Sequence, residues 1–231
     1  MNQRFGVVVV AAGKGTRMGT PESKQFLLLQ DKPVLVHTLE RFEGMEQCET
    51  IALVTSSNDV DRCREWVSQY KLPKVRDIVA GGKERQDSVY EGLKAIQKRG
   101  VELVLIHDGV RPFVTEEAVY ACCDAAVKHH AAVLAVPVKD TIKQANAEGV
   151  IVATPDRSSL WAIQTPQAFR LEDVMNAHHK AQEEGWIGTD DAMLVERMGI
   201  DVHLVEGSYT NIKLTTPEDL LWAEWWLTRN P

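Results

Sequence analysis

The segment FGVVVVAAGKGTRMG at residues 5–19 decides the fold, because an apolar, β-branched run passes directly into a glycine-rich loop. In an open parallel sheet, ligands bind just beyond the carboxyl ends of the strands. Glycines at such a position let backbone N–H groups approach phosphate oxygens closely, since no Cβ obstructs the approach. The segment therefore predicts a strand over Phe5–Ala11 that leads into a phosphate-binding loop.

Further apolar runs alternate with helical patterns along the first 136 residues. Each run is too uniformly apolar to be half-exposed, which is typical of a buried parallel sheet. The segments between them carry apolar residues at three- and four-residue spacing, as helices that cover a sheet do. We therefore expect an α/β fold with a doubly wound, mostly parallel sheet. Besides Phe5–Ala11, the expected strands are Thr50–Thr55, Val75–Ala80, Leu103–His107 and Ala131–Val136, and the expected helices are Val34–Phe42, Asp59–Gln69, Glu84–Gln97 and Glu116–His129.

The stretch at 138–167 interrupts this alternation. Thr141–Lys143 and Val150–Val152 flank a turn-rich segment, ANAEG at 145–149, and this pattern predicts a β-hairpin that projects from the sheet. An isolated hairpin is at best marginally stable in water, so an arm at about 138–160 needs a surface to pack against. A second copy of the chain, related by a two-fold axis, would provide that surface and make a homodimer.

The rest of the chain continues the same domain, so a single domain is expected over 1–231 with the arm as its projection. No internal repeat or low-complexity linker divides the sequence. After the arm, the patterns and the Thr216-Pro217 start signal predict helices at Leu171–Glu184, Asp190–Met198 and Pro217–Leu227, with strands at Val202–Val205 and Ile212–Leu214.

Composition excludes several classes of partner. The formal net charge is -7, which argues against nucleic acid and anionic membranes as binding surfaces. No run approaches the roughly 18 apolar residues that span a bilayer, and the apolar run near the start leads into Lys14 rather than a cleavage site for secretion. Four cysteines without CxxC spacing indicate buried thiols in a reducing compartment. We therefore expect a cytoplasmic protein.

The glycine loop belongs to none of the common phosphate loops. It lacks the GxxxxGK[ST] pattern of P-loop proteins, and the spacing of Gly13, Gly15 and Gly19 is only a loose variant of the dinucleotide pattern. Two cations, Arg17 and Lys24, lie on the loop and just after it, which suits a triphosphate better than a dinucleotide.

Motifs in order along the chain resemble one known family. AAGKGTRM at 11–18, followed by KQF at 24–26, is similar to the opening of the 2-C-methyl-D-erythritol 4-phosphate cytidylyltransferases of isoprenoid precursor synthesis. The resemblance extends from about Phe5 to Leu220 and implies a Rossmann-like nucleotidyltransferase fold. The later matching segments are GGKERQDSV at 81–89, HDGVRPF at 107–113, KDTIK at 139–143, Asp156-Arg157, LWAIQTPQ at 160–167, Thr189-Asp190 and NIKLT at 211–215.

The resemblance implies that the chain joins CTP to 2-C-methyl-D-erythritol 4-phosphate, with Mg²⁺ as cofactor, and releases pyrophosphate. It also implies that Arg157, just after the hairpin strands of the arm, reaches the partner's nucleotide. The acceptor phosphate is already anionic at neutral pH, its second pKa being about 6, so no general base is expected. The implied catalytic residues are Arg17, Lys24, Arg157 and Lys213; those for the nucleotide are Ala11, Ala12, Gly13, Gly15, Gly82 and Ser88; those for the acceptor are Thr141, Arg157, Thr189 and Lys213; Asp108 is implied for the metal.

Two residues depart from the family pattern, and other functions stay open. Gly109-Val110 replaces the usual two alanines, which keeps Asp108 and Arg111 in register but could alter the backbone near the metal. His107, a lone histidine beside an aspartate, is expected to be structural rather than a metal ligand. The alternatives are a ribitol-5-phosphate or related alditol-phosphate cytidylyltransferase, a non-catalytic nucleotide-sensing protein of this fold, and a dehydrogenase.

Overall fold

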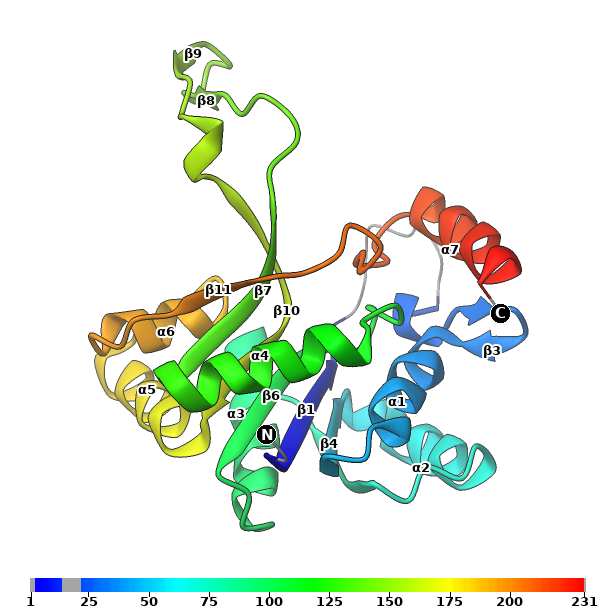
Figure 1. The fold of residues 1–231 in the computed structure, drawn as a ribbon. Helices are drawn as coiled ribbons and strands as arrows, with labels where there is room; N and C mark the ends of the chain where they lie inside the picture. Colours follow the sequence, from blue (N-terminus) through cyan, green and yellow to red (C-terminus); the bar gives the residue numbers. More distant parts are fainter. Residues whose placement is uncertain (1–2, 14–21, 231) are drawn as a thin grey trace.

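The computed structural model describes residues 3–13 and 22–230. Its central sheet consists of β1 (Phe5–Ala11), β4 (Cys48–Thr55), β5 (Val75–Ala80), β6 (Leu103–Asp108), β7 (Ala131–Pro137), β10 (Trp161–Arg170) and β11 (His203–Glu206). The strands lie in the order β11-β7-β10-β6-β1-β4-β5 (Figure 1). β10 runs antiparallel to its neighbours β6 and β7, and the other neighbouring pairs are parallel.

Helices cover both faces of this sheet (Figure 1). One face packs against α1 (Val34–Gly44), α2 (Val60–Gln69) and α4 (Glu116–His129), and the other against α3 (Arg85–Gln97), α5 (Leu171–Glu184) and α6 (Asp191–Arg197). Within β1, Val7 and Val9 belong to the first core and Val8 to the second, because successive side chains of a strand point to opposite faces. The expected doubly wound, mostly parallel α/β fold is confirmed.

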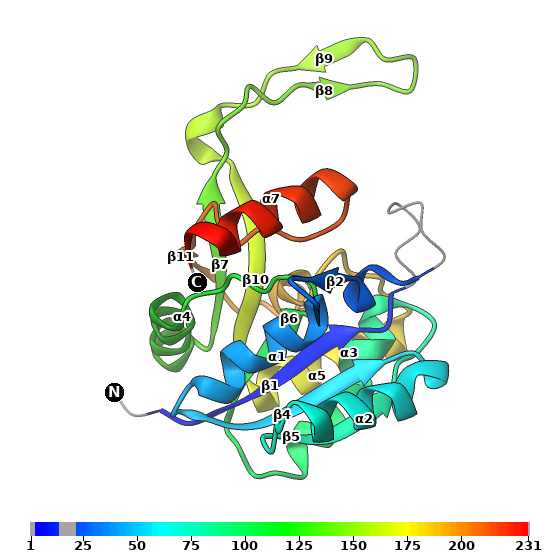
Figure 2. The ribbon, with the colours of Figure 1, turned by 90° about the vertical axis from the view of Figure 1, so that its right-hand side faces the viewer.

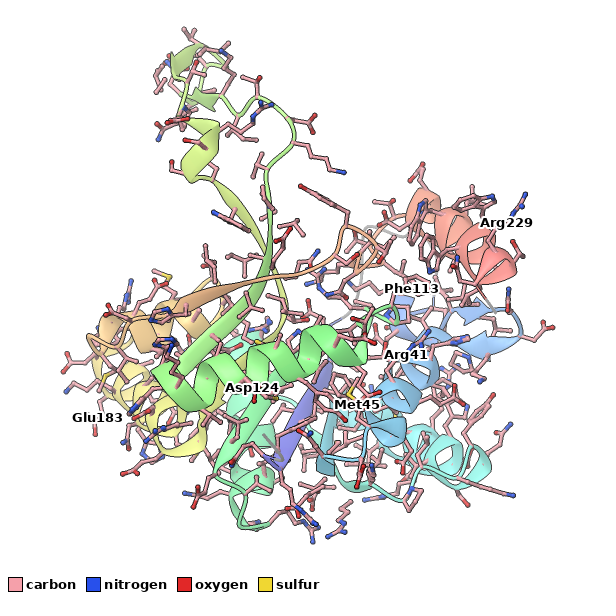
Figure 3. The ribbon with its side chains drawn as sticks, viewed as in Figure 1. Arg41, Met45, Phe113, Asp124, Glu183 and Arg229 are labelled. Atoms are coloured by element: carbon pink, nitrogen blue, oxygen red, sulfur yellow. The ribbon has the colours of Figure 1, made fainter. Side chains whose placement is uncertain are left out.

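A third, smaller core lies beside the carboxyl end of β6. Here α7 (Pro217–Arg229) packs against a hairpin of β2 (Leu28–Leu29) and β3 (Lys32–Pro33) and against the residues that follow β6. α7 begins at a capping box in which the Thr216 N–H donates to the Asp219 carboxylate at 2.9 Å. Phe113, labelled in Figure 3, packs edge-on against Trp222 with ring centroids 5.6 Å apart. α7 thereby anchors the chain just after Asp108.

β10 is absent from the expected strands. Pro166 lies in its middle, and proline cannot donate to a sheet ladder, so the sequence favours a turn there. The sheet accommodates Pro166 through a break in register with β7 between Ile163 and Gln167, and pairing with β6 begins at Gln167. The residues that resemble a turn before α5 are therefore a central antiparallel strand.

Two further expectations are wrong in detail. Ile212–Leu214 is not a strand but part of a loop, in which the Leu214 N–H donates to the Val110 carbonyl at 2.9 Å. The first arm strand is β8 (Gln144–Ala145) rather than Thr141–Lys143, because its pairing with β9 (Ile151–Ala153) starts closer to the turn. The sequence patterns locate these segments but do not show which residues pair as strands.

Between β7 and β10 the chain leaves the sheet as an arm (Figure 2). Its base is closed by the Val138 N–H, which donates to the Leu160 carbonyl at 3.1 Å, and the arm also carries a short helical turn, η4 (Arg157–Ser159). Val150, Ile151 and Val152 at its tip are 58–60% exposed. Within one chain these apolar side chains lie uncovered.

The four cysteines are free thiols buried in the structure, in agreement with the sequence pattern. Burial raises the pKa of Cys48 and of Cys122 to about 12, so both stay protonated at neutral pH. Among the described residues, no helix is long and apolar enough to cross a membrane.

Candidate active site

A cavity opens where the carboxyl ends of β1 and β6 meet the start of α3, the position at which open α/β sheets bind ligands. Its walls come from segments far apart in sequence: the end of β1, the short helix η2 (Lys24–Phe26), the connection from β5 to α3, and the residues around Lys213. The predicted site residues that line it are Ala11, Ala12, Gly13, Lys24, Gly82, Ser88, Asp108 and Lys213. Gly15 and Arg17 lie outside the described residues.

The glycines before α3 bring that helix close to the end of β1. A Cβ on Gly81 would lie 2.6 Å from Ser88 Oγ and 2.7 Å from Ala12 Cβ, and one on Gly82 would collide with Asp87. Because both positions are closed to a side chain, the backbone itself forms this wall of the cavity. Ser88 fixes the wall: its hydroxyl accepts from the Gly82 N–H at 3.2 Å and donates to the Glu84 carbonyl at 3.1 Å.

Asp108 ends β6 among three cations. Its carboxylate lies 2.9 Å from Lys213 Nζ, 3.5 Å from Arg111 Nε and 3.9 Å from Arg85 Nε. Burial alone raises the pKa of Asp108, but the three cations outweigh burial and hold that pKa well below its usual range. The carboxylate is therefore ionised at neutral pH. Arg85 has a closer carboxylate partner in Asp191, at 2.7 Å. Lys213 and Arg111 therefore face the single carboxylate of Asp108. This excess of positive charge suits an anionic ligand such as a phosphate.

His107 has a structural role, as expected. Its Nε2–H donates to the Arg111 carbonyl at 3.1 Å, which leaves Nδ1, 3.2 Å from the Thr165 hydroxyl, as an acceptor. Burial lowers the pKa of His107 to about 4, so the ring is neutral at pH 7. The same Thr165 hydroxyl accepts from the Asp108 N–H at 3.0 Å. His107 and Thr165 together fix the backbone that carries Asp108.

Asn211 brings Lys213 to the cavity from the far end of the chain. The Asn211 side chain donates to the Thr165 carbonyl at 2.9 Å and to Gln164 Oε1 at 3.2 Å, while its own carbonyl accepts from Arg111 at 2.7 Å. Asn211 is buried, so these bonds are shielded from water. The loop conformation that replaces the expected strand is therefore held to β10 and to the end of β6.

The Gly109-Val110 departure leaves the site intact. A Cβ on Gly109 would lie 3.0 Å from Leu35 Cδ1 and 3.1 Å from Ala11 Cβ, so glycine relieves tight contacts here. Val110 is buried in the core beneath α7. Asp108 and Arg111 remain 3.5 Å apart, so the ion pair between them is kept.

Arg85 is a cavity residue for which the sequence offers little signal. Its Nη1 lies 2.7 Å from the carboxylate of Asp191, a buried residue that also lies 3.2 Å from His178 Nε2. Burial raises the pKa of Asp191, yet Arg85 and His178 outweigh burial and lower it. Arg85 and Asp191 are 106 residues apart, so no local pattern reveals the pair.

Replacing Asp191 by asparagine is expected to lower the free energy of unfolding by about 3 kcal/mol at pH 7, because it leaves Arg85 without its buried partner. The pKa of Asp191 is lower in the folded state than in the unfolded state, where it is about 3.9. Its stabilising contribution is therefore present above about pH 4 and is lost as the pH falls towards the folded pKa. Urea unfolding of both proteins should show a difference that shrinks below about pH 4. A difference that is equal at pH 7 and pH 3 would contradict the ionised pair.

The structure does not bring every predicted residue to the cavity of one chain. Arg157 and Thr141 are exposed on the arm, and Arg157 Nη1 donates to the Lys139 carbonyl at 2.7 Å. Thr189 is exposed just before α6, where its hydroxyl lies 3.7 Å from Met193 Sδ. In Figure 2 the arm extends away from the sheet that carries the cavity. Neither Arg157 nor Thr141 lines the cavity that Lys24 and Asp108 share within one chain.

Comparison with known proteins yields one consistent result. The family model described as 2-C-methyl-D-erythritol 4-phosphate cytidylyltransferase matches residues 5–229. A 2-C-methyl-D-erythritol 4-phosphate cytidylyltransferase of Bacillus velezensis is 53% identical over 222 residues, covering 95% of this chain and 94% of the relative. One of Halalkalibacterium halodurans is 51% identical over 220 residues, covering 95% of each. The crystal structure of the 4-diphosphocytidyl-2C-methyl-D-erythritolsynthase from Anaerococcus prevotii superposes with a TM-score of 0.85 at 34% identity, over 99% of this chain and 97% of that one.

Proposed function

This chain belongs to the 2-C-methyl-D-erythritol 4-phosphate cytidylyltransferase family, and from that membership we propose which of its residues perform the reaction. It is a CTP-dependent cytidylyltransferase that forms 4-diphosphocytidyl-2-C-methyl-D-erythritol and pyrophosphate from CTP and 2-C-methyl-D-erythritol 4-phosphate. This activity replaces the dehydrogenase and nucleotide-sensing alternatives, and the relatives' names match this acceptor rather than an alditol phosphate. One observation carries the assignment to the cavity: Lys24, Asp108 and Lys213 line it together.

The chemistry requires alignment and charge neutralisation. An oxygen of the acceptor phosphate attacks the α-phosphorus of CTP in line, a new P–O bond forms, and the bond to the bridging oxygen breaks as pyrophosphate leaves with the electron pair. Negative charge grows around the five-coordinate phosphorus, and cations fixed in advance stabilise it. We assign this role to Lys24, at the cavity wall beside Gly13, and to Arg17. The acceptor phosphate is itself the anionic nucleophile, so no residue needs to remove a proton.

We assign Mg²⁺ to Asp108. The described residues contain no group of three or more His, Cys, Asp or Glu that could hold a metal on its own. Mg²⁺ in nucleotide enzymes is commonly held by one or two carboxylates, with substrate phosphates and water as the other ligands. A single ionised carboxylate at the cavity wall fits that pattern. When bound, the ion neutralises and orients phosphate oxygens of CTP.

We assign the acceptor phosphate to Lys213 and to Arg157, with Thr189 and Thr141 as further contacts. Lys213 lines the cavity, its side chain is 37% exposed, and its Nζ lies 2.9 Å from Asp108. Arg157 and Thr141 lie on the arm, and they require that the arm of a second chain reach this cavity. The assignment of the acceptor site therefore depends on the quaternary structure.

We propose a homodimer formed through the arms. The exposed Val150, Ile151 and Val152 support it, because a two-stranded hairpin with uncovered apolar side chains is unstable in water. A two-fold axis would let each arm cover the other and place each Arg157 at the partner's cavity. A cytoplasmic location belongs to the same proposal and is supported by the free buried thiols.

Pyrophosphate release tests the activity. CTP and Mg²⁺ should be incubated with 2-C-methyl-D-erythritol 4-phosphate, with ribitol 5-phosphate and with no acceptor in parallel. Rapid release of pyrophosphate is expected with 2-C-methyl-D-erythritol 4-phosphate, because the relatives are named as cytidylyltransferases of this acceptor. Equal or faster release with ribitol 5-phosphate would restore the alditol-phosphate alternative, and release without an acceptor would indicate hydrolysis.

CTP is expected to be preferred over UTP, ATP and GTP. The wall between Gly82 and Ser88 brings polar backbone and side-chain groups to the cavity, and such groups can distinguish the amino group of cytosine from the carbonyl of uracil. A buried polar mismatch costs roughly 1–3 kcal/mol, so kcat/KM for CTP should exceed that for UTP by about fivefold or more. Equal kcat/KM values for CTP and UTP would refute the assignment of the base to this wall.

A further inference from the structure

We propose that Gln25 is a positioning residue for CTP: its side-chain amide joins the turn after β1 to the short helix that carries Lys24. The inference rests on the proposed function, because it concerns the nucleotide cavity. Gln25 lies between Lys24 and Phe26 in η2, but its side chain makes a different contact from either neighbour.

A single amide group spans the turn. Gln25 Nε2 donates to the Ala11 carbonyl at 2.8 Å and to the Gly13 carbonyl at 3.1 Å. Both hydrogen atoms of the NH₂ group are thereby used on two carbonyls that flank Ala12. The Gln25 residue is only 3% exposed, so water does not compete for these bonds. Ala11, Ala12 and Gly13 all line the cavity.

These bonds fix the orientation of the backbone. In a planar trans peptide, the carbonyl of one residue and the N–H of the next point in opposite directions. Holding the Ala11 carbonyl therefore sets the direction of the Ala12 N–H at the wall of the cavity. Gly13 has no Cβ to restrict its conformation, so without Gln25 the turn could adopt many more backbone conformations. Gln25 provides the restraint that the glycine lacks.

The same residue sets the place of Lys24. η2 is a three-residue turn without a side-chain cap, so it has little rigidity of its own. Phe26 is buried in the core and packs edge-on against Trp66 with ring centroids 5.3 Å apart. Gln25 ties the same helix to the end of β1. With the two residues that follow Lys24 held in this way, the Lys24 backbone is restrained relative to Ala12 and Gly13.

Gln25→Met tests the proposal, because methionine keeps the length of the side chain and removes its donors. The Kd for CTP, measured by calorimetry without acceptor, and the KM for CTP should each rise about tenfold, since one lost hydrogen bond or more is worth roughly that factor. The KM for the acceptor should change less than about twofold, since Lys213 is held through Asn211 and not through Gln25. A thermal scan identifies the temperature at which all variants remain folded.

Lys74→Met is the matched control. Lys74 Nζ also donates to a backbone carbonyl, that of Met45, at 2.6 Å, but Lys74 does not line the cavity. This variant should lose some stability and keep its Kd and KM for CTP. If Gln25→Met also keeps both constants while folded, Gln25 has only a structural role and the proposal is wrong. Failure of the wild type to turn over CTP would instead contradict the proposed function.

Gln25→Glu adds a readout that a structural role would not change. When ionised, the introduced carboxylate has no donor and faces two carbonyl oxygens, so CTP binding should be at least as weak as in Gln25→Met. When protonated, it regains one O–H donor. Burial and the carbonyls both raise its pKa above the ordinary 4.3 or so. For each variant, the Kd for CTP is divided by the Kd of the wild type at the same pH. This ratio should fall for Gln25→Glu as the pH is lowered from 8.5 to 6, and it should stay constant for Gln25→Met. If both ratios depend on pH in the same way, the hydrogen-bond donor of the Gln25 side chain does not position CTP and the proposal is wrong.

Discussion

Replacing Lys24 or Arg17 by alanine is expected to lower kcat by roughly 10² or more, the effect of removing one preorganised donor to transition-state charge. Lys24 lines the cavity beside Gly13 and shares it with Asp108. Arg17 lies outside the described residues and is included for its place on the same loop. The measurement is pyrophosphate release at saturating CTP and acceptor, so that weaker binding does not lower the rate.

An exposed lysine serves as the control for this prediction. Lys98 follows α3 and does not line the cavity, so Lys98→Ala should keep a kcat close to that of the wild type. Thermal unfolding should show that all three variants are folded at the assay temperature. Near-normal turnover of Lys24→Ala or of Arg17→Ala would remove that residue from the mechanism.

Mixing two inactive variants is expected to restore about a quarter of wild-type activity if the active site is shared. In Arg157→Ala the cavity is intact and the arm is defective, and in Lys24→Ala the reverse holds. Random exchange of subunits at equal concentrations makes about half of the dimers mixed, and each mixed dimer regains one intact site of two. Pyrophosphate release is followed before and after exchange, which is verified by tagging one subunit.

The structure provides a sharp control for the mixing experiment. Lys24 and Lys213 line the same cavity of one chain, so a mixture of Lys24→Ala and Lys213→Ala should stay inactive even after full exchange. Recovery in this control would mean that the recovered activity does not report a shared site. If the mixture of Arg157→Ala and Lys24→Ala also stays inactive after proven exchange, Arg157 acts within its own chain and the shared site is wrong.

The sequence predicts the parallel part of the fold well, because each buried strand is a local apolar run. Phe5–Ala11 and Val75–Ala80 are strands with the expected bounds. β10 is missed because the strand includes Pro166 and tolerates it only through a register break that the neighbouring β7 permits. The Ile212–Leu214 pattern resembles a strand, but the hydrogen bond of Leu214 to Val110 holds it in a loop. Tertiary contacts decide these two cases, and no local pattern contains them.

Some residues of the candidate site can also be predicted from the sequence, and others cannot. Lys24, Asp108 and Lys213 are identified through the resemblance of their motifs, and the structure brings all three to one cavity. Gln25 lies within a quoted motif, yet its contacts with Ala11 and Gly13 depend on the path of the turn. Arg85 and Asp191 meet only because α3 and α6 lie on the same face of the sheet. Residues that act through other residues carry little signal in sequence.

The arm joins two strands that are already neighbours in the sheet, and this has an evolutionary consequence. β7 and β10 pair up to Trp161 and Pro137, and the Val138–Leu160 hydrogen bond closes the base of the arm. In topological terms, the arm is an insertion in the loop of an ordinary hairpin. The entropy cost of lengthening such a loop grows only slowly with its length. Descendants of this chain can therefore lengthen or shorten the arm, while the cavity at the ends of β1 and β6 stays the same.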